Sequence, residues 1–294
     1  MTQTNESVDV VARPLRHYGR WFSAVLIAAL LGALVWSLVT APSINHSMIS
    51  KYMFDPLVVD GARTTVILTV ISMSIAIVLA IFLAVMKLST NPVLRVISST
   101  YIQVFRGTPL LVQVVFWGYL GLIYSDITIS VPFTHHVLWS RPTSDAISAF
   151  TAGVIALALN EAAYAAEVVR AGIQDVDKGQ FEAADALGFS RALTMRRVVL
   201  PQAMRTIVPA LGNETIGMLK NTALLEVLNV LELYTRTQHI SSQNLAQVEL
   251  LIVAAVWYMA MTTVLSVPQR WLEKYFGRGT AQTPSSKRWL KGSK

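Results

Sequence analysis

Residues 177–204 read DKGQFEAADALGFSRALTMRRVVLPQAM and lie between two apolar stretches of the chain. The first half of this segment predicts a short amphipathic helix. Asp177 is a favourable N-cap residue, and Gln180 three residues later completes the pattern of a capping box. Apolar side chains then recur at helical spacing, at Phe181, Ala184 and Leu187. Gly188 follows as a residue that commonly ends a helix.

A second helix is predicted to begin after Ser190, which is a good N-cap residue. It is expected to stop near Leu200, because Pro201 disfavours a helical conformation in the residue before it. Basic side chains flank the apolar stripe at Arg191, Arg196 and Arg197. Two short helices with an apolar stripe between positive charges suit docking to a soluble partner, so the segment predicts a docking surface rather than a plain linker.

The composition indicates that lipid is the solvent of this 294-residue chain. Hydrophobic residues make up 53%, charged residues only 14%, and the mean hydropathy is +0.51, whereas a soluble chain carries about 25% charged residues. The formal charge is +7, but the basic residues lie between apolar runs and at the ends, so nucleic-acid binding is not expected. The absence of cysteine excludes disulfides and cysteine nucleophiles.

Six apolar stretches are long enough to span a membrane, which takes roughly 20 residues. They cover residues 22–39, 66–86, 107–124, 148–169, 207–230 and 248–267. Pro268 is expected to end the last one. The first stretch could instead be a cleaved signal peptide, but its length and the position of Pro42 disfavour cleavage.

The orientation of the spans follows from lysine and arginine, which gather in the cytoplasmic segments of membrane proteins. With the N-terminus inside, eighteen of them fall in cytoplasmic segments and four in outer segments. The sequence therefore predicts a multi-pass protein of the inner membrane with both termini in the cytoplasm.

Four features of the 177–204 segment stand at fixed spacings. Glu182-Ala183-Ala184 is followed after three residues by Gly188, and after nine more by Val198-Val199-Leu200-Pro201. This pattern resembles the EAA signature of permeases that work with a binding protein in ATP-binding-cassette (ABC) importers. In that family isoleucine is usual where Val198 stands here.

Three further stretches resemble the subgroup of these permeases that takes up polar amino acids such as histidine, glutamine and arginine. They are Phe105 to Gln113, Ala163 to Arg170, and Leu219 to Leu224. The last is similar to a Lys-Asp-Thr-Ser-Leu motif, with departures at Asn221 and Ala223. The resemblance covers about residues 61–276.

The resemblance implies an all-α membrane protein of six transmembrane helices, five of which form the ABC importer permease core. Residues 172–204 would be the cytoplasmic EAA coupling loop, and residues 61–276 the permease domain. Residues 1–60 would add a cytoplasmic segment, an extra transmembrane helix and a periplasmic loop, and residues 277–294 a basic cytoplasmic tail. The outer loop 125–147 would be an insertion.

The resemblance also implies partners: cytoplasmic ABC ATPase subunits, a periplasmic amino-acid-binding protein and a second, identical or homologous, permease subunit, all around membrane lipid. The chain contains no G-x-x-x-x-G-K-[S/T] run. ATP and magnesium would therefore be bound by the ATPase, and this chain would be a transport subunit without cofactor, metal or catalytic residues. The residues expected to couple to the ATPase are Phe181, Glu182, Ala183, Ala184, Leu187, Gly188, Leu200 and Pro201.

Polar residues at membrane depth are costly and mark functional sites. Counting about 1.5 Å per helical residue places Glu161 and Lys220 near the membrane midplane. A free amino acid carries both an ammonium and a carboxylate, so one protein charge of each sign could bind it. The expected substrate-binding residues are Glu161, Asn160, Lys220, Gln113, Thr108, Asn221 and Thr222.

Other interpretations of these charges stay open at this point. Glu161 and Lys220 could pair with each other and lock two helices together. Glu167 is expected to pair with a cytoplasmic arginine, Arg106 to extend toward the membrane border, and Tyr164 to pack in the core.

The sequence thus favours the permease subunit of an ATP-driven importer that moves a polar amino acid across the inner membrane by alternating access. The alternative is an ion-coupled secondary amino acid carrier, which needs no EAA loop and usually has more spans or inverted repeats. A non-transporting membrane receptor is a third possibility, but it would leave the midplane charges unexplained.

Single cysteines introduced into this cysteine-free chain test the predicted topology. We expect His136→Cys, in the outer loop, to react with a membrane-impermeant maleimide in intact spheroplasts. Lys178→Cys should react only after the membrane is opened. Cysteines within residues 235–247 should behave like position 136, and those after residue 278 like position 178. Labelling at position 178 without labelling at position 136 would reverse the orientation.

Overall fold

The computed structural model describes residues 18–130 and 137–277 of a chain that divides into two units, residues 1–46 and 47–294. In the first unit a single helix, α1 (Tyr18–Val39), covers the predicted first span. The N-terminal segment before residue 18 and the predicted tail after residue 277 lie outside the described residues.

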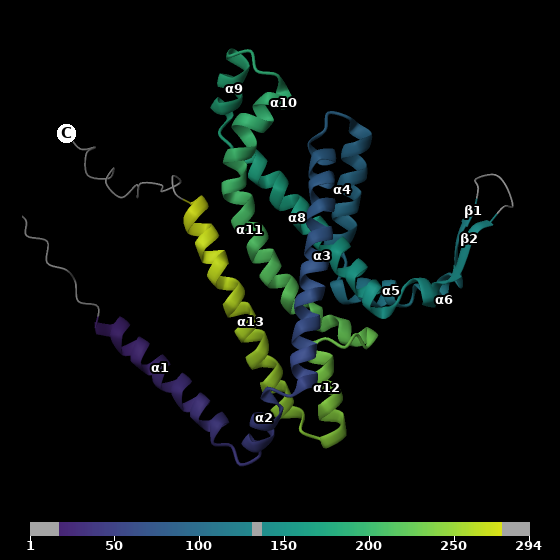
Figure 1. The fold of residues 1–294 in the computed structure, drawn as a ribbon. Helices are drawn as coiled ribbons and strands as arrows, with labels where there is room; N and C mark the ends of the chain where they lie inside the picture. Colours follow the sequence, from purple (N-terminus) through teal and green to yellow (C-terminus); the bar gives the residue numbers. More distant parts are fainter. Residues whose placement is uncertain (1–17, 131–136, 278–294) are drawn as a thin grey trace, which may run out of the picture. The chain divides into compact units, whose positions relative to one another are not determined.

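The second unit is almost entirely helical (Figure 1). In chain order its elements are α2 (His46–Met53), α3 (Pro56–Leu88), α4 (Pro92–Gly107), α5 (Leu110–Gly118), α6 (Leu120–Ile123), β1 (Asp126–Ser130), β2 (Val137–Pro142), α7 (Thr143–Ala146), α8 (Ala149–Gln174), α9 (Lys178–Ala186), α10 (Arg191–Thr194), η1 (Met195–Val199), α11 (Leu200–Asn221), η2 (Thr222–Leu228), α12 (Leu233–Asn244) and α13 (Gln247–Phe276). Here η1 is a π-helical turn and η2 a 3₁₀ helix.

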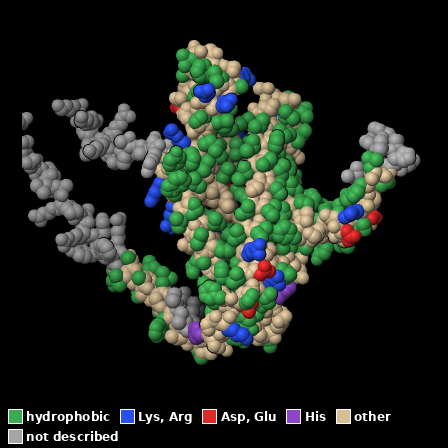
Figure 2. All heavy atoms as spheres, viewed as in Figure 1, with side chains coloured by type: hydrophobic (Ala, Val, Ile, Leu, Met, Phe, Trp, Pro, Cys, Tyr) green, Lys and Arg blue, Asp and Glu red, His purple; other side chains and the backbone are tan. Residues whose placement is uncertain are grey.

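Three helices within the described residues are long and apolar enough to cross a membrane: α3, α8 and α13. They contain the predicted second, fourth and sixth spans. Figure 2 shows hydrophobic side chains over most of the face formed by α3, α11 and α13, with charged side chains gathered toward its ends. This distribution agrees with helices that stand in lipid.

The core of the second unit is built on α8, which packs most extensively against α3. The side chains of α8 that are fully buried at this contact are mostly alanines: Ala156, Ala162, Ala163, Ala165 and Ala166. Small side chains let two helices approach closely, which is the main source of helix association where lipid removes the hydrophobic driving force. At one end of this contact, Glu167 pairs with Lys87 of α3 as well as with Arg170 on its own helix, 2.7 Å away.

The predicted third span, residues 107–124, is not one helix. Helix α4 ends at Gly107, where the span was expected to begin, and the chain turns at Thr108 and Pro109 before α5. Thr108 is extended (φ −114°, ψ 141°) because the proline ring that follows it disfavours the helical conformation. The apolar run therefore continues after this turn as two short helices, α5 and α6.

Two other predicted helix boundaries are wrong. Helix α13 continues through Pro268 to Phe276, and the next residue, Gln269, donates a hydrogen bond of 2.6 Å from Nε2 to the carbonyl oxygen of Pro209 in α11. This hydrogen bond ties α13 to α11 directly after the proline. The predicted fifth span, 207–230, is α11 followed by the tighter η2, so its helix begins at Leu200.

The second helix of the 177–204 segment does not stop at Leu200 as predicted. From Arg191 the chain stays helical into α11, passing through the π turn η1. The N–H of Leu200 donates to the carbonyl of Met195, five residues back. Because Pro201 has no N–H and its ring crowds the preceding turn, the wider π turn lets the helix continue past it.

Within residues 18–130 and 137–277 the expected all-α fold has one exception, in the predicted insertion 125–147. Strands β1 and β2 form an antiparallel hairpin, with Ile127 opposite Arg141. Both strands contain residues of high β propensity, at Ile127, Thr128, Val137 and Trp139. The residues that join the strands, 131–136, lie outside the described part of the chain.

A buried carboxylate ties α12 to α3 and α13. The side chain of Glu232 is fully buried, and its Oε1 accepts from the N–H (2.7 Å) and hydroxyl (3.0 Å) of Thr235 at the start of α12. Its Oε2 accepts from the hydroxyls of Tyr258 in α13 (2.7 Å) and Thr65 in α3 (3.3 Å). Each oxygen therefore has two donors, which is what a buried charge requires.

We expect Glu232→Ala to destabilise the protein, since each donor left buried and unpaired costs about 1–3 kcal/mol. The measurement is the midpoint of thermal unfolding of the purified chain in detergent. Glu226→Ala, at an exposed position in the preceding η2 helix, is the matched control and should unfold like the wild type. Equal midpoints for the two variants would contradict a stabilising role for the Glu232 cluster.

Candidate functional site

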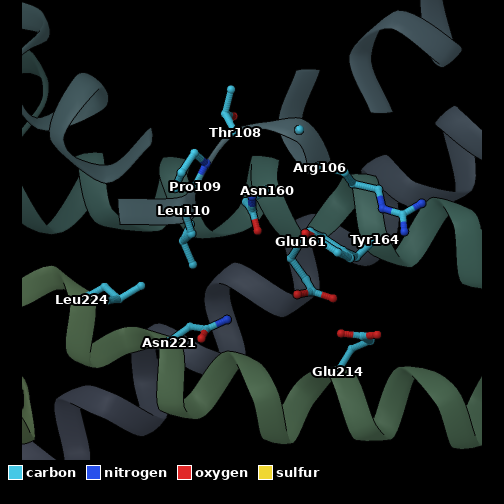
Figure 3. Close-up of a pocket in the computed structure, with 11 residues that line it drawn as sticks. Arg106, Thr108, Pro109, Leu110, Asn160, Glu161, Tyr164, Glu214, Asn221 and Leu224 are labelled. Carbon is cyan, nitrogen blue, oxygen red and sulfur yellow. The ribbon is translucent and has the colours of Figure 1, made fainter. Parts of the chain in front are cut away.

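A polar cavity of about 500 Å³ lies where the turn between α4 and α5 faces α8 and the end of α11 (Figure 3). Its lining residues come from these elements in turn: Arg106, Gly107, Thr108, Pro109 and Leu110, then Asn160, Glu161 and Tyr164, then Glu214, Asn221 and Leu224. Four of the seven predicted substrate-binding residues are among them: Thr108, Asn160, Glu161 and Asn221. The cavity therefore lies at the turn between α4 and α5, where the predicted third span was expected to begin.

The turn that forms one wall is held by two amides. Gln113 donates from Nε2 to the carbonyls of Phe105 (2.9 Å) and Thr108 (3.1 Å) and to the Thr108 hydroxyl (2.7 Å). Asn160 of α8 donates from Nδ2 to Gln113 Oε1 (3.2 Å) and to the Phe105 carbonyl (3.1 Å). Gln113 is buried and does not line the cavity, so it positions the turn. The sequence had predicted instead that Gln113 faces the substrate. The amide oxygen of Asn160 points into the cavity (Figure 3).

Glu161 is the most informative side chain of the cavity. It is only 5% exposed, and its Oε1 is buried without a hydrogen-bond partner among the described residues. Its carboxylate points toward that of Glu214 on α11 (Figure 3). A buried polar oxygen without a hydrogen-bond partner is costly, so this oxygen is available to a group that enters the cavity.

Positive charge enters the cavity from Arg106. Its guanidinium lies over the ring of Tyr164, 5.0 Å from the ring centroid, which is a cation–π geometry. Tyr164 is 36% exposed, so the prediction that it packs in the core is wrong. The cavity thus holds two carboxylates, one guanidinium and the amides of Asn160 and Asn221, a set that can bind a small charged polar molecule.

Two predicted substrate-binding residues do not reach the cavity. Lys220 is exposed, does not line the cavity, and takes part in none of the ion pairs found among the described residues. The alternative, a pair between Glu161 and Lys220, is not found among the described residues either. Thr222 is fully buried, and its hydroxyl donates to the carbonyl of Leu219 (2.8 Å), which closes the end of α11.

The sequence prediction missed Glu214 as a site residue, although a signal was present. Glu214 and Asn221 are seven residues apart, which is two helical turns, so they share a face of α11. Lys220 is rotated by about 100° from Asn221 and points elsewhere. Depth in the membrane alone led to Lys220, whereas helical phase points to Glu214, which lines the cavity. Among the described residues no group of three His, Asp or Glu side chains could hold a metal ion.

The 177–204 segment forms the second candidate site, and its local predictions hold in part. Asp177 caps α9 by accepting from the N–H of Gly179 at 2.7 Å. Gln180 does not complete a capping box, because its amide oxygen accepts from Gln202 at 3.1 Å. Gly188 has φ +73°, and the N–H groups of Gly188 and Phe189 donate to carbonyls of the last turn. This is the Schellman pattern in which glycine ends a helix.

The predicted apolar stripe of α9 is divided between two faces. Phe181 and Ala184 face inward, where Phe181 packs on a cluster that includes Val199 and Ala203 of the following helix. Leu187 is 73% exposed. The members of the predicted coupling set that are open to a partner are Glu182, Ala183, Leu187, Gly188, Leu200 and Pro201.

Comparison with known proteins agrees with this architecture. The sequence pattern of the family described as binding-protein-dependent transport system inner membrane component matches residues 76–278. The chain belongs to this family. It is 43% identical over 281 residues to the arginine transport system permease protein of Corynebacterium glutamicum, which covers 95% of this chain and 87% of that protein. It is 36% identical to the nopaline transport system permease protein of Agrobacterium fabrum, over 72% of this chain and 84% of that one.

Solved structures give the same result. The permease matches a crystal structure of an amino acid ABC transporter with histidines, with a TM-score of 0.67, 37% identity, and coverage of 78% of this chain and 98% of the other. A methionine ABC transporter in an inward-facing conformation shares the fold alone, with a TM-score of 0.60 at 17% identity. The protein is thus the permease subunit of an amino acid ABC importer, with its ATPase in a separate partner. The ion-coupled carrier receives no support.

We expect Gly188→Val to impair coupling to the ATPase. A β-branched side chain is strained at positive φ, by roughly 1–2 kcal/mol, so the end of α9 should rearrange while membrane insertion is kept. The measurement is co-purification of the ATPase together with uptake. Gly188→Asn is the matched control, because asparagine tolerates this conformation and the position has open space around it. Normal association and uptake in the valine variant would remove α9 from the coupling surface.

Proposed function

We propose that this permease carries a cationic amino acid through the cavity between α4, α8 and α11. The observation that supports this most is the pair of facing carboxylates, Glu161 and Glu214, one of which has a buried oxygen without a partner. A single guanidinium, that of Arg106, lines the same space. The excess of negative charge favours a ligand whose own net charge is positive.

Each charged group of such a ligand has a counterpart in the cavity. The guanidinium of Arg106 suits the ligand's carboxylate, since arginine binds carboxylates with paired hydrogen bonds. Glu161, with the amide oxygen of Asn160 beside it, suits the α-ammonium. Glu214 on the opposite wall is then left for a cationic side chain. A neutral amino acid would leave that carboxylate unpaired.

The relatives support the same class of substrate. The arginine transport system permease protein is similar to this chain over 95% of its length, and the similar crystal structure is of an amino acid transporter with histidines. Arginine, and histidine when protonated, carry positive side chains. Both names therefore agree with an acidic cavity.

The rest of the assembly follows from the family. We infer that residues 61–276 form the permease domain, that residues 172–204 dock on an ATPase that binds ATP and magnesium, and that a second permease subunit completes the pathway. A periplasmic amino-acid-binding protein would deliver the substrate. In this arrangement the six spans comprise α1, α3, the broken α4–α5 segment, α8, the α11–η2 segment and α13, with both termini in the cytoplasm.

We expect Glu214→Gln to change selectivity. The variant loses one charge-assisted hydrogen bond of about 1.5–3 kcal/mol. The affinity for arginine and lysine should therefore fall by about ten- to a hundredfold, while the affinity for glutamine stays nearly unchanged. Glu161→Gln should lower the affinity for arginine, lysine and glutamine alike, because every amino acid has an α-ammonium. The measurement is thermal stabilisation of the purified complex with its ATPase against a series of concentrations of each amino acid.

Glu226→Gln removes a carboxylate from an exposed position outside the cavity and is the matched control. It should bind all three amino acids like the wild type. Equal losses of affinity for arginine and glutamine in the Glu214 variant would show that the cavity does not distinguish amino acids by the charge of their side chains. Unchanged binding in both cavity variants would place the substrate elsewhere.

A further inference from the structure

A second hollow, lined by apolar residues, lies between α3 and α13. It lies on the other face of α11 from Glu214 and Asn221, which line the polar cavity. Its volume is about 330 Å³, within the range of small-ligand sites. Helices α3 and α13 both pack on α11 and scarcely contact each other, so α11 forms the floor. Leu219 is buried there, while Val70 and Val264 stand on the two rims with exposed side chains.

The hollow contains no free polar group that would call for water or a polar ligand. Its two hydroxyls are bonded within their own helices: Thr69 donates to the carbonyl of Thr65 (2.8 Å) and Thr215 to that of Leu211 (2.8 Å). The indole N–H of Trp257 donates to the carbonyl of Met53 (2.8 Å). What remains exposed in the hollow is aliphatic and aromatic surface.

One end of the hollow is marked by a positive charge. Arg63 lies three residues before Val66 and seven before Val70 on α3, so the three share a helical face. Arg63 is exposed and takes part in none of the ion pairs found among the described residues. It stands just before the apolar span of α3, and Val70 is about 10 Å deeper along the helix.

We propose that this hollow is a binding site for an anionic phospholipid, with one acyl chain between α3 and α13 and the headgroup phosphate on Arg63. Two observations select a lipid as the occupant. The hollow lies between two of the helices that cross the membrane, where acyl chains are the surrounding medium. The positive charge of Arg63 complements a phosphate, and Arg63 stands at the end of the apolar span, where arginine pairs with lipid headgroups.

A lipid bound in this hollow would also lie beside the buried cluster around Glu232. The hydroxyls of Thr65 and Tyr258, which hold Glu232, lie on residues adjacent in sequence to Val66 and Trp257 of the hollow. A lipid seated there would pack α3 and α13 onto α11 beside this cluster. We therefore expect the bound lipid to raise the stability of the permease.

The test uses the purified permease with its ATPase, delipidated in detergent and titrated with phosphatidylglycerol or phosphatidylcholine, with bound lipid counted by native mass spectrometry. We expect one phosphatidylglycerol per permease to bind about tenfold or more tightly than phosphatidylcholine. Arg63→Gln should abolish this preference, and Arg63→Lys should retain part of it. Ala260→Trp, which fills the hollow, should remove the bound lipid.

Two matched controls separate this site from ordinary lipid contact. Val267→Trp places the same ring on an exposed position of α13 outside the hollow, and Arg95→Gln removes an exposed arginine from α4. Both should bind lipid like the wild type. Equal binding of the two lipids by the wild type would overturn the proposal. So would loss of permease pairing, without loss of lipid, in Ala260→Trp, because the hollow would then receive a second subunit.

Discussion

The close contact of α8 with its neighbours is the constraint on which the second unit depends. In lipid, helices gain little from hydrophobic burial, so they must gain from tight packing and from satisfied polar groups. The alanines of α8 allow this packing against α3, and α4, α5 and α11 contact the same helix. Because α8 is held on several sides, Asn160 and Glu161 keep fixed positions at the cavity. A carboxylate on a loosely packed helix could turn away from the membrane interior instead.

The sequence predicted the elements well wherever a local interaction decides the structure. The N-cap at Asp177 and the positive φ of Gly188 follow from the residues themselves. The prolines were harder because their effect depends on tertiary surroundings. Pro109 ends a helical path, whereas Pro201 is accommodated by a π turn and Pro268 by the neighbouring Gln269 bond to α11. No local pattern distinguishes these three outcomes.

The location of the candidate site was predicted, but its charges were predicted only in part. Glu161, Asn160 and Asn221 were found because polar residues at membrane depth are rare and costly. Lys220 was chosen by depth alone, and its helical phase directs it away from the cavity. Gln113 satisfies the backbone at the break between α4 and α5, a role that became visible only once the predicted span was found to be broken. The same break brings Arg106 to the cavity.

The unbroken helix from Arg191 into α11 has a mechanical consequence. The 177–204 segment is joined to α8 at one end and leads into α11 at the other, and these two helices carry the facing carboxylates. Glu161 is thirteen residues from the end of α8, and Glu214 is fourteen from the start of α11, so the two lever arms are each about 20 Å long. We expect the segment to act as a pivot between these two arms. A tilt of a few degrees between the arms changes the separation of their far ends by roughly 1–2 Å, which is enough to make or break a hydrogen bond.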